Sequence, residues 1–218
     1  MSDSVKLKSI VVLISGNGSN LQAIIDACEQ AKIPGKITAV ISNKAHAYGL
    51  QRAKAADIPA VFIDHTQYVT REAYDQQLLV QINEFAPDLI VLAGFMRILS
   101  REFVEHFQGQ ILNIHPSLLP KYKGLHTHQR AIDAGDREHG ASVHFVTANL
   151  DDGPVILQSK VPIFENQDAE ELTQRVIVQE RQMYPLVVKW FCQDRLIMLN
   201  NKAFLDGIEL EEQGYAAN

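Results

Sequence analysis

Cysteine, long apolar runs and excess positive charge are all scarce in this 218-residue sequence. Cys28 and Cys192 are its only cysteines, which excludes a disulfide-stapled scaffold and a cysteine-rich zinc site and suits a reducing compartment. No apolar run reaches the ~18–20 residues that a membrane span requires. The 20 Lys and Arg residues against 26 Asp and Glu residues give a net charge of −6. We therefore expect neither a membrane nor a nucleic acid as a partner.

The N-terminal segment lacks the pattern of a signal peptide. Its apolar run, Ile10–Ile14, is too short for the core of such a peptide and leads directly into a glycine loop. We therefore expect a cytoplasmic protein. The composition, 46% hydrophobic and 21% charged, is that of an ordinary globular chain. The length predicts a single domain over residues 1–218.

Short β-branched runs alternate with amphipathic stretches through the first half of the chain. The predicted strands are Ile10–Ile14, Ile37–Ile41, Ala60–Ile63, Leu89–Leu92 and Ile111–Ile114. The predicted helices between them are Leu21–Ala31, Tyr48–Ala56, Thr70–Phe85 and Arg101–Phe107. This rhythm predicts an α/β fold with an open, mostly parallel, doubly wound sheet.

The pattern loosens after about residue 125, where we expect an antiparallel C-terminal portion. The predicted elements there are a helix at Leu125–Ala134, strands at Ala141–Val146 and Val155–Pro162, a helix at Ala169–Phe191 and a hairpin at Arg195–Leu205. Asp168, with Glu171 three residues later, has the pattern of an N-cap for the long helix. Pro185 should kink or end that helix.

The glycine loop Ser15–Asn20 lies between a buried strand and a helix start. Unpaired N–H groups at a helix start favour a phosphate, and Ser19 with Gln22 has the form of a capping box. A dinucleotide fingerprint fails, because Leu21 stands where a third glycine would be needed. An NTP loop is excluded because no Gly-Lys-Ser/Thr follows. A plain capped turn remains the alternative to a phosphate site.

A second candidate site is the segment Asn113–Pro120. Its strand should end near His115, and alternation places Asn113 and His115 on the same side. Ligands bind at the carboxyl ends of the strands of such sheets. An amide and an imidazole there would suit a developing oxyanion. The alternative is a purely structural pair that caps a turn.

The segment Leu150–Pro154 is a turn pattern that could supply a carboxylate. If it folds over the predicted strand end, Asp151 could pair with His115 and collect a proton from a reacting group. Turn chemistry alone also explains this segment. His126 and His128 have i,i+2 spacing, which is wrong for a helical metal site, and we expect no metal. His144 we expect to pack on a sheet face.

At these residues the sequence resembles the folate-dependent formyltransferases. The Asn-Ile-His-Pro-Ser-Leu-Leu-Pro stretch is shared by that family, and Ser-Gly-Asn-Gly-Ser-Asn narrows the resemblance to its phosphoribosylglycinamide formyltransferase (GAR transformylase) branch. The likeness runs from about residue 10 to residue 215. It is carried by Ile10–Ile25, Val91–Leu99, Ile111–His128 and Gly140–Gln158.

The resemblance implies a role for each of three residue groups. By the family pattern the phosphate and ribose of the substrate are bound by Gly18, Ser19, Asn20 and Glu180. The folate-binding positions are Arg71, Met96, Arg97, Ile98, Leu99, Asn113 and Thr147, and the catalytic trio is Asn113, His115 and Asp151. Residues 1–100 would then form a phosphate-binding half, and residues 101–218 a catalytic and folate-binding half. Asp152 stands at a position that varies in the family and is often glycine.

The implied reaction is formyl transfer from 10-formyltetrahydrofolate to glycinamide ribonucleotide, in a Rossmann-like fold and without a metal. The implied partners are these small molecules, and we expect a monomer or weak homodimer. The alternatives are a formyltetrahydrofolate hydrolase, another folate-dependent N-formyltransferase, or a non-catalytic phosphosugar-binding module. A hydrolase would carry an N-terminal regulatory domain, and a tRNA formyltransferase a basic C-terminal one. We expect neither in this chain.

Overall fold

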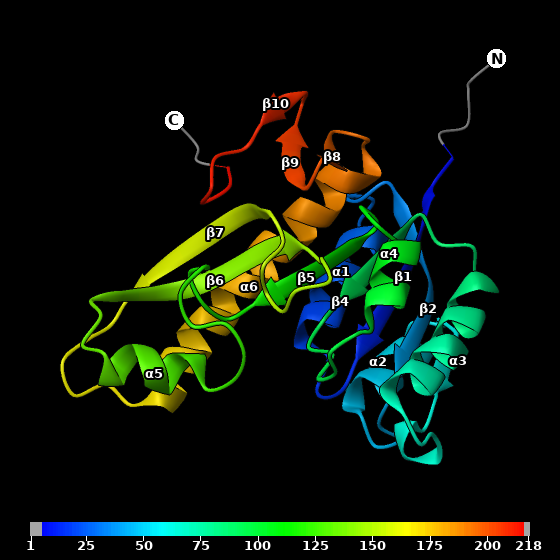
Figure 1. Cartoon of the computed structure of the whole chain (residues 1–218), viewed down its shortest axis with the longest axis horizontal. Coiled ribbons are helices and arrows are strands. Elements are labelled where there is room, and N and C mark those ends of the chain that lie inside the picture. The colour runs from blue at the N-terminus through cyan, green and yellow to red at the C-terminus, as the bar shows by residue number, and fades with distance from the viewer. Residues whose placement is uncertain (1–5, 216–218) are drawn as a thin grey trace.

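A computed structural model describes residues 6–215 of the chain, and a seven-stranded sheet runs through its centre (Figure 1). The strand order is β3-β2-β1-β4-β5-β6-β7, parallel from β3 to β5 and antiparallel from β5 to β7. The strands are β1 (Lys8–Ile14), β2 (Gly35–Ser42), β3 (Ala60–Phe62), β4 (Leu89–Leu92), β5 (Ile111–His115), β6 (Glu138–Phe145) and β7 (Val155–Pro162).

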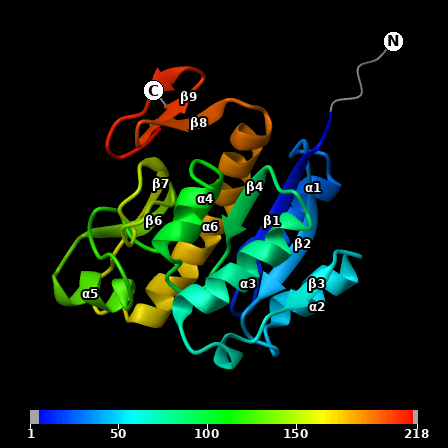
Figure 2. The same ribbon diagram turned by 45° about the vertical axis from the view of Figure 1, so that its right-hand side comes forward.

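Helices cover both faces of this sheet, as the two ribbon views show (Figures 1 and 2). One buried cluster joins the sheet to α1 (Ser19–Glu29), α2 (Tyr48–Ala55) and α6 (Ala169–Cys192). A separate cluster on the other face joins it to α3 (Arg71–Asn83) and α4 (Arg101–His106). A short 3-10 helix, His65–Gln67, precedes α3, and α5 (Thr127–Asp133) packs against α6. The apolar runs of β1 and β4 are therefore buried on both sides, as parallel strands require.

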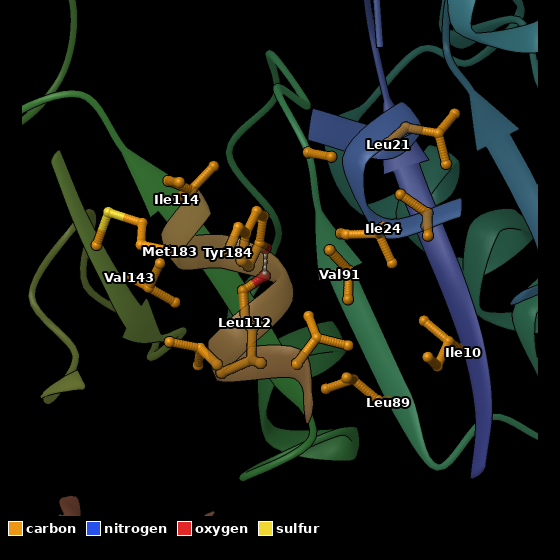
Figure 3. Close-up of a cluster of buried hydrophobic side chains, with 14 of the residues drawn as sticks. Ile10, Leu21, Ile24, Leu89, Val91, Leu112, Ile114, Val143, Met183 and Tyr184 are labelled. Carbon is orange, nitrogen blue, oxygen red and sulfur yellow. Dashed lines mark hydrogen bonds between the residues drawn. The ribbon is translucent and has the colours of Figure 1, made fainter. Parts of the chain in front are cut away.

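The long helix α6 lies across the sheet and fastens two of its strands (Figure 3). Met183 and Tyr184 pack among buried side chains of β4, β5 and β6. The Tyr184 hydroxyl lies 3.0 Å from the backbone oxygens of both Leu92 and Leu112. It therefore ties the carboxyl end of β4 to β5 directly below Asn113.

A second, three-stranded antiparallel sheet follows α6. It consists of β8 (Leu196–Leu199), β9 (Lys202–Leu205) and β10 (Ile208–Glu209) in the order β10-β9-β8. Asn200 and Asn201 connect β8 to β9 with φ values of 50° and 60°, the conformation that a two-residue hairpin turn requires.

The predicted fold class is confirmed, including the antiparallel C-terminal portion and the hairpin. Asp168 caps α6 as predicted, with its side chain accepting from the backbone N–H of Glu171 at 2.8 Å. The expectation that Pro185 could end this helix is wrong, because α6 continues to Cys192. Proline removes one N–H donor, and the carbonyl left without it belongs to Arg181, an exposed residue that water can reach.

The predicted capping box at the start of α1 is also wrong. Ser19 is the first helical residue, Gly18 is the N-cap in the left-handed conformation, and no side chain caps the helix. The Gln22 side chain instead donates to Asp26 and accepts from Arg52. The first-turn N–H groups of α1 are therefore free of a side-chain cap, which is the arrangement that an anion can use.

The order of the strands determines where a ligand can bind. The chain leaves β1 toward β2 through α1, whereas α3 brings it back to β4 on the opposite side of β1. In open α/β sheets such a reversal marks the crevice outside the carboxyl ends of the two strands, here β1 and β4, as the usual position for a ligand.

Candidate active site

The segments that follow β1 and β4 are joined by a short hydrogen-bond network centred on Ser15. The Ser15 backbone N–H donates to Gly94 O at 3.1 Å. Its hydroxyl donates to Asn43 Oδ1 at 2.6 Å and accepts from the Met96 N–H at 2.8 Å. The glycine loop and the segment that contains Met96 are therefore held as neighbours.

The glycine loop lies against the start of α2 at a distance that allows no side chain. Gly18 has φ 75°, and a Cβ there would lie 2.8 Å from the Cα of Gly49. The Gly49 N–H donates to Gly16 O at 3.1 Å. Sequence reasoning missed Gly49, because its need for glycine comes from a contact across 31 residues of chain and not from a local turn.

Arg52, on α2, fastens the same loop and was also missed. Its guanidinium donates to Asn17 O at 2.9 Å, to Asn17 Oδ1 at 3.0 Å and to Gln22 Oε1 at 3.1 Å, and lies 4.8 Å from the Tyr48 ring centroid. It therefore adds a positive charge beside the open end of α1. The sequence around Arg52 gave no signal for this role, because the residues that it contacts lie 30 to 35 positions away.

Asn20 and Glu180, which are 160 positions apart, meet beside this loop. Asn20 Nδ2 donates to Glu180 Oε2 at 2.9 Å, and both residues are buried. Burial raises the pKa of Glu180, while the hydrogen bond from Asn20 acts in the opposite direction. The contact places a carboxylate from α6 next to the N-terminus of α1.

His115 and Asp151 face each other at the end of β5. His115 Nδ1 lies 3.5 Å from Asp151 Oδ2, and the two side chains are 7% and 8% exposed. His115 Nε2 is 2.9 Å from Tyr122 O, and Asp151 Oδ2 accepts from the Gly124 N–H at 2.9 Å. Both imidazole nitrogens thus face acceptors, an arrangement that suits the imidazolium form.

Asn113 points to the same place, and His144 orients it. Asn113 Nδ2 is 3.1 Å from His144 Nε2, while His144 Nδ1 is 2.8 Å from Phe145 O. Burial lowers the pKa of His144, so the ring is neutral and its proton is on Nδ1. Its Nε2 then accepts one N–H of Asn113 and leaves the other free. Because Nε2 also lies 3.9 Å from Asp151 Oδ1, the expectation that His144 only packs on a sheet face was incomplete.

The residues predicted to bind folate fall into two environments. Met96 and Ile98 are 65% and 52% exposed, whereas Leu99 is buried. Arg97 lies 4.7 Å from the ring centroid of Tyr74. The exposed apolar side chains could contact a flat ring, whereas Leu99 packs in the core and can act only through its backbone.

The two arginines of this group lie near one buried carboxylate. Burial raises the pKa of Asp75, and both Arg97 and Arg71 oppose that rise. Asp75 Oδ2 also accepts from the Ser100 N–H at 2.5 Å. Thr147, in the loop that leads to Asp151, is partly exposed and is not part of this cluster.

Two cavities border these residues. One of about 370 Å³ lies between Asp151 and the C-terminal sheet, and one of about 560 Å³ extends from the glycine loop to the ends of β2 and β3. Within residues 6–215, no group of three or more His, Cys, Asp and Glu side chains could hold a metal ion. Over the same residues, no helix is long and apolar enough to cross a membrane.

Known proteins resemble this chain along nearly its whole length. The family model described as formyl transferase matches residues 8–188. The phosphoribosylglycinamide formyltransferases of Escherichia coli (strain K12) and Haemophilus influenzae are 59% and 54% identical over 210 residues, which are 96% of this chain and 99% of each relative. A solved phosphoribosylglycinamide formyltransferase from Coxiella burnetii, in complex with CHES, has a TM-score of 0.92 at 51% identity and covers 96% of this chain and 99% of its own.

Proposed function

The chain belongs to the formyl transferase family, and from that membership we propose that it is a phosphoribosylglycinamide formyltransferase of purine biosynthesis. It transfers the formyl group of 10-formyltetrahydrofolate to the amine of N1-(5-phospho-D-ribosyl)glycinamide. The observation that carries the proposal is the meeting of Asn113, His115 and Asp151, from two distant segments, at the carboxyl end of β5.

The sugar phosphate binds where α1 begins. Gly18 lets the ligand approach the backbone, and the first-turn N–H groups at Ser19 and Asn20 donate to the phosphate. Glu180, held by Asn20, accepts hydrogen bonds from ribose hydroxyls. The positive charge of Arg52 favours binding of the phosphate dianion further.

The folate binds on the β4 side of the crevice. The exposed side chains of Met96 and Ile98 contact its aromatic portion, and the charges of Arg71 and Arg97 suit its carboxylates. Arg97 Nε is buried and has no partner among the described residues, which fits a hydrogen bond completed by a ligand. Thr147 begins the loop that closes on the pterin.

The reaction begins with attack of the neutral substrate amine on the formyl carbon. The oxyanion that forms accepts from the free N–H of Asn113 and is stabilised by the positive charge of protonated His115, whose Nε2 is held by Tyr122 O. One such donor contributes roughly 3–4 kcal/mol of barrier lowering. Asp151 pairs with the imidazolium form of His115 across 3.5 Å and accepts the proton of the attacking amine, directly or through water. A proton returned to N10 lets it leave as a neutral amine.

Three further expectations belong to this proposal. The division into a phosphate-binding half (1–100) and a catalytic half (101–218) describes most of the site, although Glu180 of the second half contacts Asn20 of the first. The enzyme works in the cytoplasm, without a metal, on small molecules. It is a monomer or a weak homodimer, which sedimentation at several concentrations would test.

The proposal is tested by turnover of the full-length chain with both substrates. Asp151→Asn and His115→Ala should each lower kcat/KM far more than about threefold, which corresponds to ~1 kcal/mol. His106→Ala, at the exposed end of α4, is the matched control and should leave kcat/KM unchanged.

Two outcomes would contradict the assignment. Activity of both site variants within about threefold of wild type would remove the catalytic roles. Formate release without formylated glycinamide ribonucleotide would indicate the hydrolase alternative.

A further inference from the structure

A strained segment, residues 121–126 and here called the strap, passes over the catalytic histidine and carboxylate. The Tyr122 carbonyl oxygen lies 2.9 Å from His115 Nε2, and the Gly124 N–H donates to Asp151 Oδ2 at 2.9 Å. Tyr122, Gly124 and His126 all have positive φ, between 56° and 80°. Non-glycine residues hold such angles only where surrounding contacts require them.

The loop that carries Asp151, residues 147–154, is strained as well. Asp151 itself has φ 47°. Its neighbour Asp152 is fixed on both oxygens, by Lys123 Nζ on Oδ1 and by Asn149 Nδ2 on Oδ2 at 3.2 Å. Within residues 6–215, Lys123–Asp152 is the ion pair that joins the strap to this loop.

The strap is also anchored from its other side. Arg130 of α5 donates to the carbonyls of Lys123 at 2.7 Å and Leu125 at 3.3 Å. Lys123 is therefore held at its backbone by α5, while its ammonium group reaches the Asp151 loop. A displacement of the Lys123 side chain would leave the Gly124–Asp151 hydrogen bond as the tie between strap and loop, without releasing the strap from α5.

We propose that Lys123 and Asp152 are positioning residues that clamp the strap onto the Asp151 loop and so hold Asp151 against His115. This inference rests on the proposed function for its catalytic consequence and on the contacts above for its structural one. The Lys123 ammonium also balances the negative charge that Asp152 places beside Asp151. Loss of either partner thus loosens the site and, in addition, changes its charge in opposite directions.

The sign of that charge effect separates the clamp from a merely structural role. Lys123→Met leaves an unbalanced carboxylate near His115, which favours protonated forms and moves both limbs of the pH–rate profile to higher pH. Asp152→Asn leaves an unbalanced ammonium and moves both limbs to lower pH. Each shift should be about a few tenths of a pH unit, because both side chains are partly exposed and solvent screens their charges.

Besides Lys123 and Asp152, three other titratable groups face His115 and Asp151 from neighbouring elements. They are His144 and His139 of β6 and His128 of α5. None of the variants changes these three histidines. The difference between the two single variants therefore reports the clamp charges alone.

The experiment is a double-mutant cycle on the full-length chain with Lys123→Met, Asp152→Asn and the double variant. Each single change should lower kcat/KM by about 2–5-fold, as expected for a half-exposed pair. The kcat/KM of the double variant should be no lower than that of the less active single variant. Its pH profile should return to the wild-type position. Salt at ~0.5 M should bring wild type and single variants together.

Hydrogen exchange provides a readout that does not depend on turnover. The amide of Gly124 should exchange faster in both single variants than in wild type. Lys8→Met, which removes the Lys8–Asp194 pair of 2.8 Å at the other end of β1, is the matched control and should change neither exchange at Gly124 nor kinetics.

The outcomes separate this inference from the proposed function. The clamp would be overturned if the two single variants moved the pH profile in the same direction or if their losses of kcat/KM added up in the double variant. It would also be overturned if the Gly124 amide exchanged at the wild-type rate in both single variants. Absence of formyl transfer in the wild type would overturn the proposed function, while the exchange data would still decide whether the clamp exists.

Discussion

Gly18→Ala should damage the phosphate end of the site through a contact that the structure defines. An alanine in the left-handed conformation costs about 1–2 kcal/mol. Its methyl carbon would also lie 2.8 Å from the Cα of Gly49, where no flexible side chain can yield. The glycine loop and α2 must then separate by about half an ångström to reach an ordinary contact. We expect a loss of about 2–3 kcal/mol of unfolding free energy, or roughly 4–10 °C in Tm.

The separation should appear mainly in the binding of one substrate. A hydrogen bond from a backbone N–H to a charged group contributes about 1.5–3 kcal/mol. Loss of one such bond from the displaced N–H of Ser19 or Asn20 should raise the KM for glycinamide ribonucleotide by about 10–100-fold. The KM for the formyl folate should stay within about twofold, because the site proposed for it lies on the β4 side. Steady-state kinetics with each substrate varied in turn measures both values.

Gly16→Ala is the control within the same loop. A Cβ at Gly16 meets no atom within 4 Å, and its φ lies outside the left-handed region. We expect a Tm within about 2 °C of wild type and unchanged kinetics. If Gly18→Ala behaves like Gly16→Ala, the argument from the close contact with Gly49 is wrong.

Three further predictions follow from buried groups. Tyr184→Phe should lower the unfolding free energy by about 1 kcal/mol, and calorimetry showing an unchanged Tm would count against the role of its hydroxyl between β4 and β5. Because burial raises the pKa of Glu180 in the folded state above its unfolded value, its ionisation costs stability as pH rises through that window. The Glu180→Gln variant should therefore have a higher Tm than wild type at neutral pH and the same Tm at a pH below the pKa of Glu180 in the unfolded chain. A difference in Tm that stays constant with pH would refute this. Burial raises the thiol pKa values of Cys28 and Cys192 to about 11 and about 12, so both thiols should be alkylated at neutral pH far more slowly in the native chain than in the unfolded chain; labelling of the native chain at the rate of a free thiol would contradict it.

The central sheet could be predicted from the sequence because its signals are local. The apolar runs at Ile10–Ile14 and Leu89–Leu92 are too short and too β-branched for helices, and the helical periodicity between them implies parallel crossovers. The same reasoning places Asn113 and His115 on one side of β5, since side chains alternate along a strand. The structure places His115 beside Asp151, and Asn113 against His144, whose Nε2 lies 3.9 Å from Asp151.

The contacts that complete the site could not be predicted, because they join segments far apart in the chain. Nothing near Gly49 or Arg52 indicates that α2 will lie against the glycine loop. His144 has the pattern of any inward-facing strand residue, and its role appears only when β6 pairs with β5 in the observed register. Ser19 was misplaced by one position because Gly18, in the left-handed conformation, takes the N-cap place that the Ser19–Gln22 pattern predicted for the serine.

In the binding mode proposed above, the bond between Asn20 and Glu180 makes substrate binding depend on the synthesis of α6. The segment proposed to bind the sugar phosphate leaves the ribosome early, but its carboxylate partner emerges some 160 residues later. A nascent chain therefore cannot bind its substrate in this way until α6 has packed against α1. Once docked, the bound nucleotide draws the first and last thirds of the polypeptide together, so saturation with substrate should protect the whole molecule against unfolding and not just one end of it.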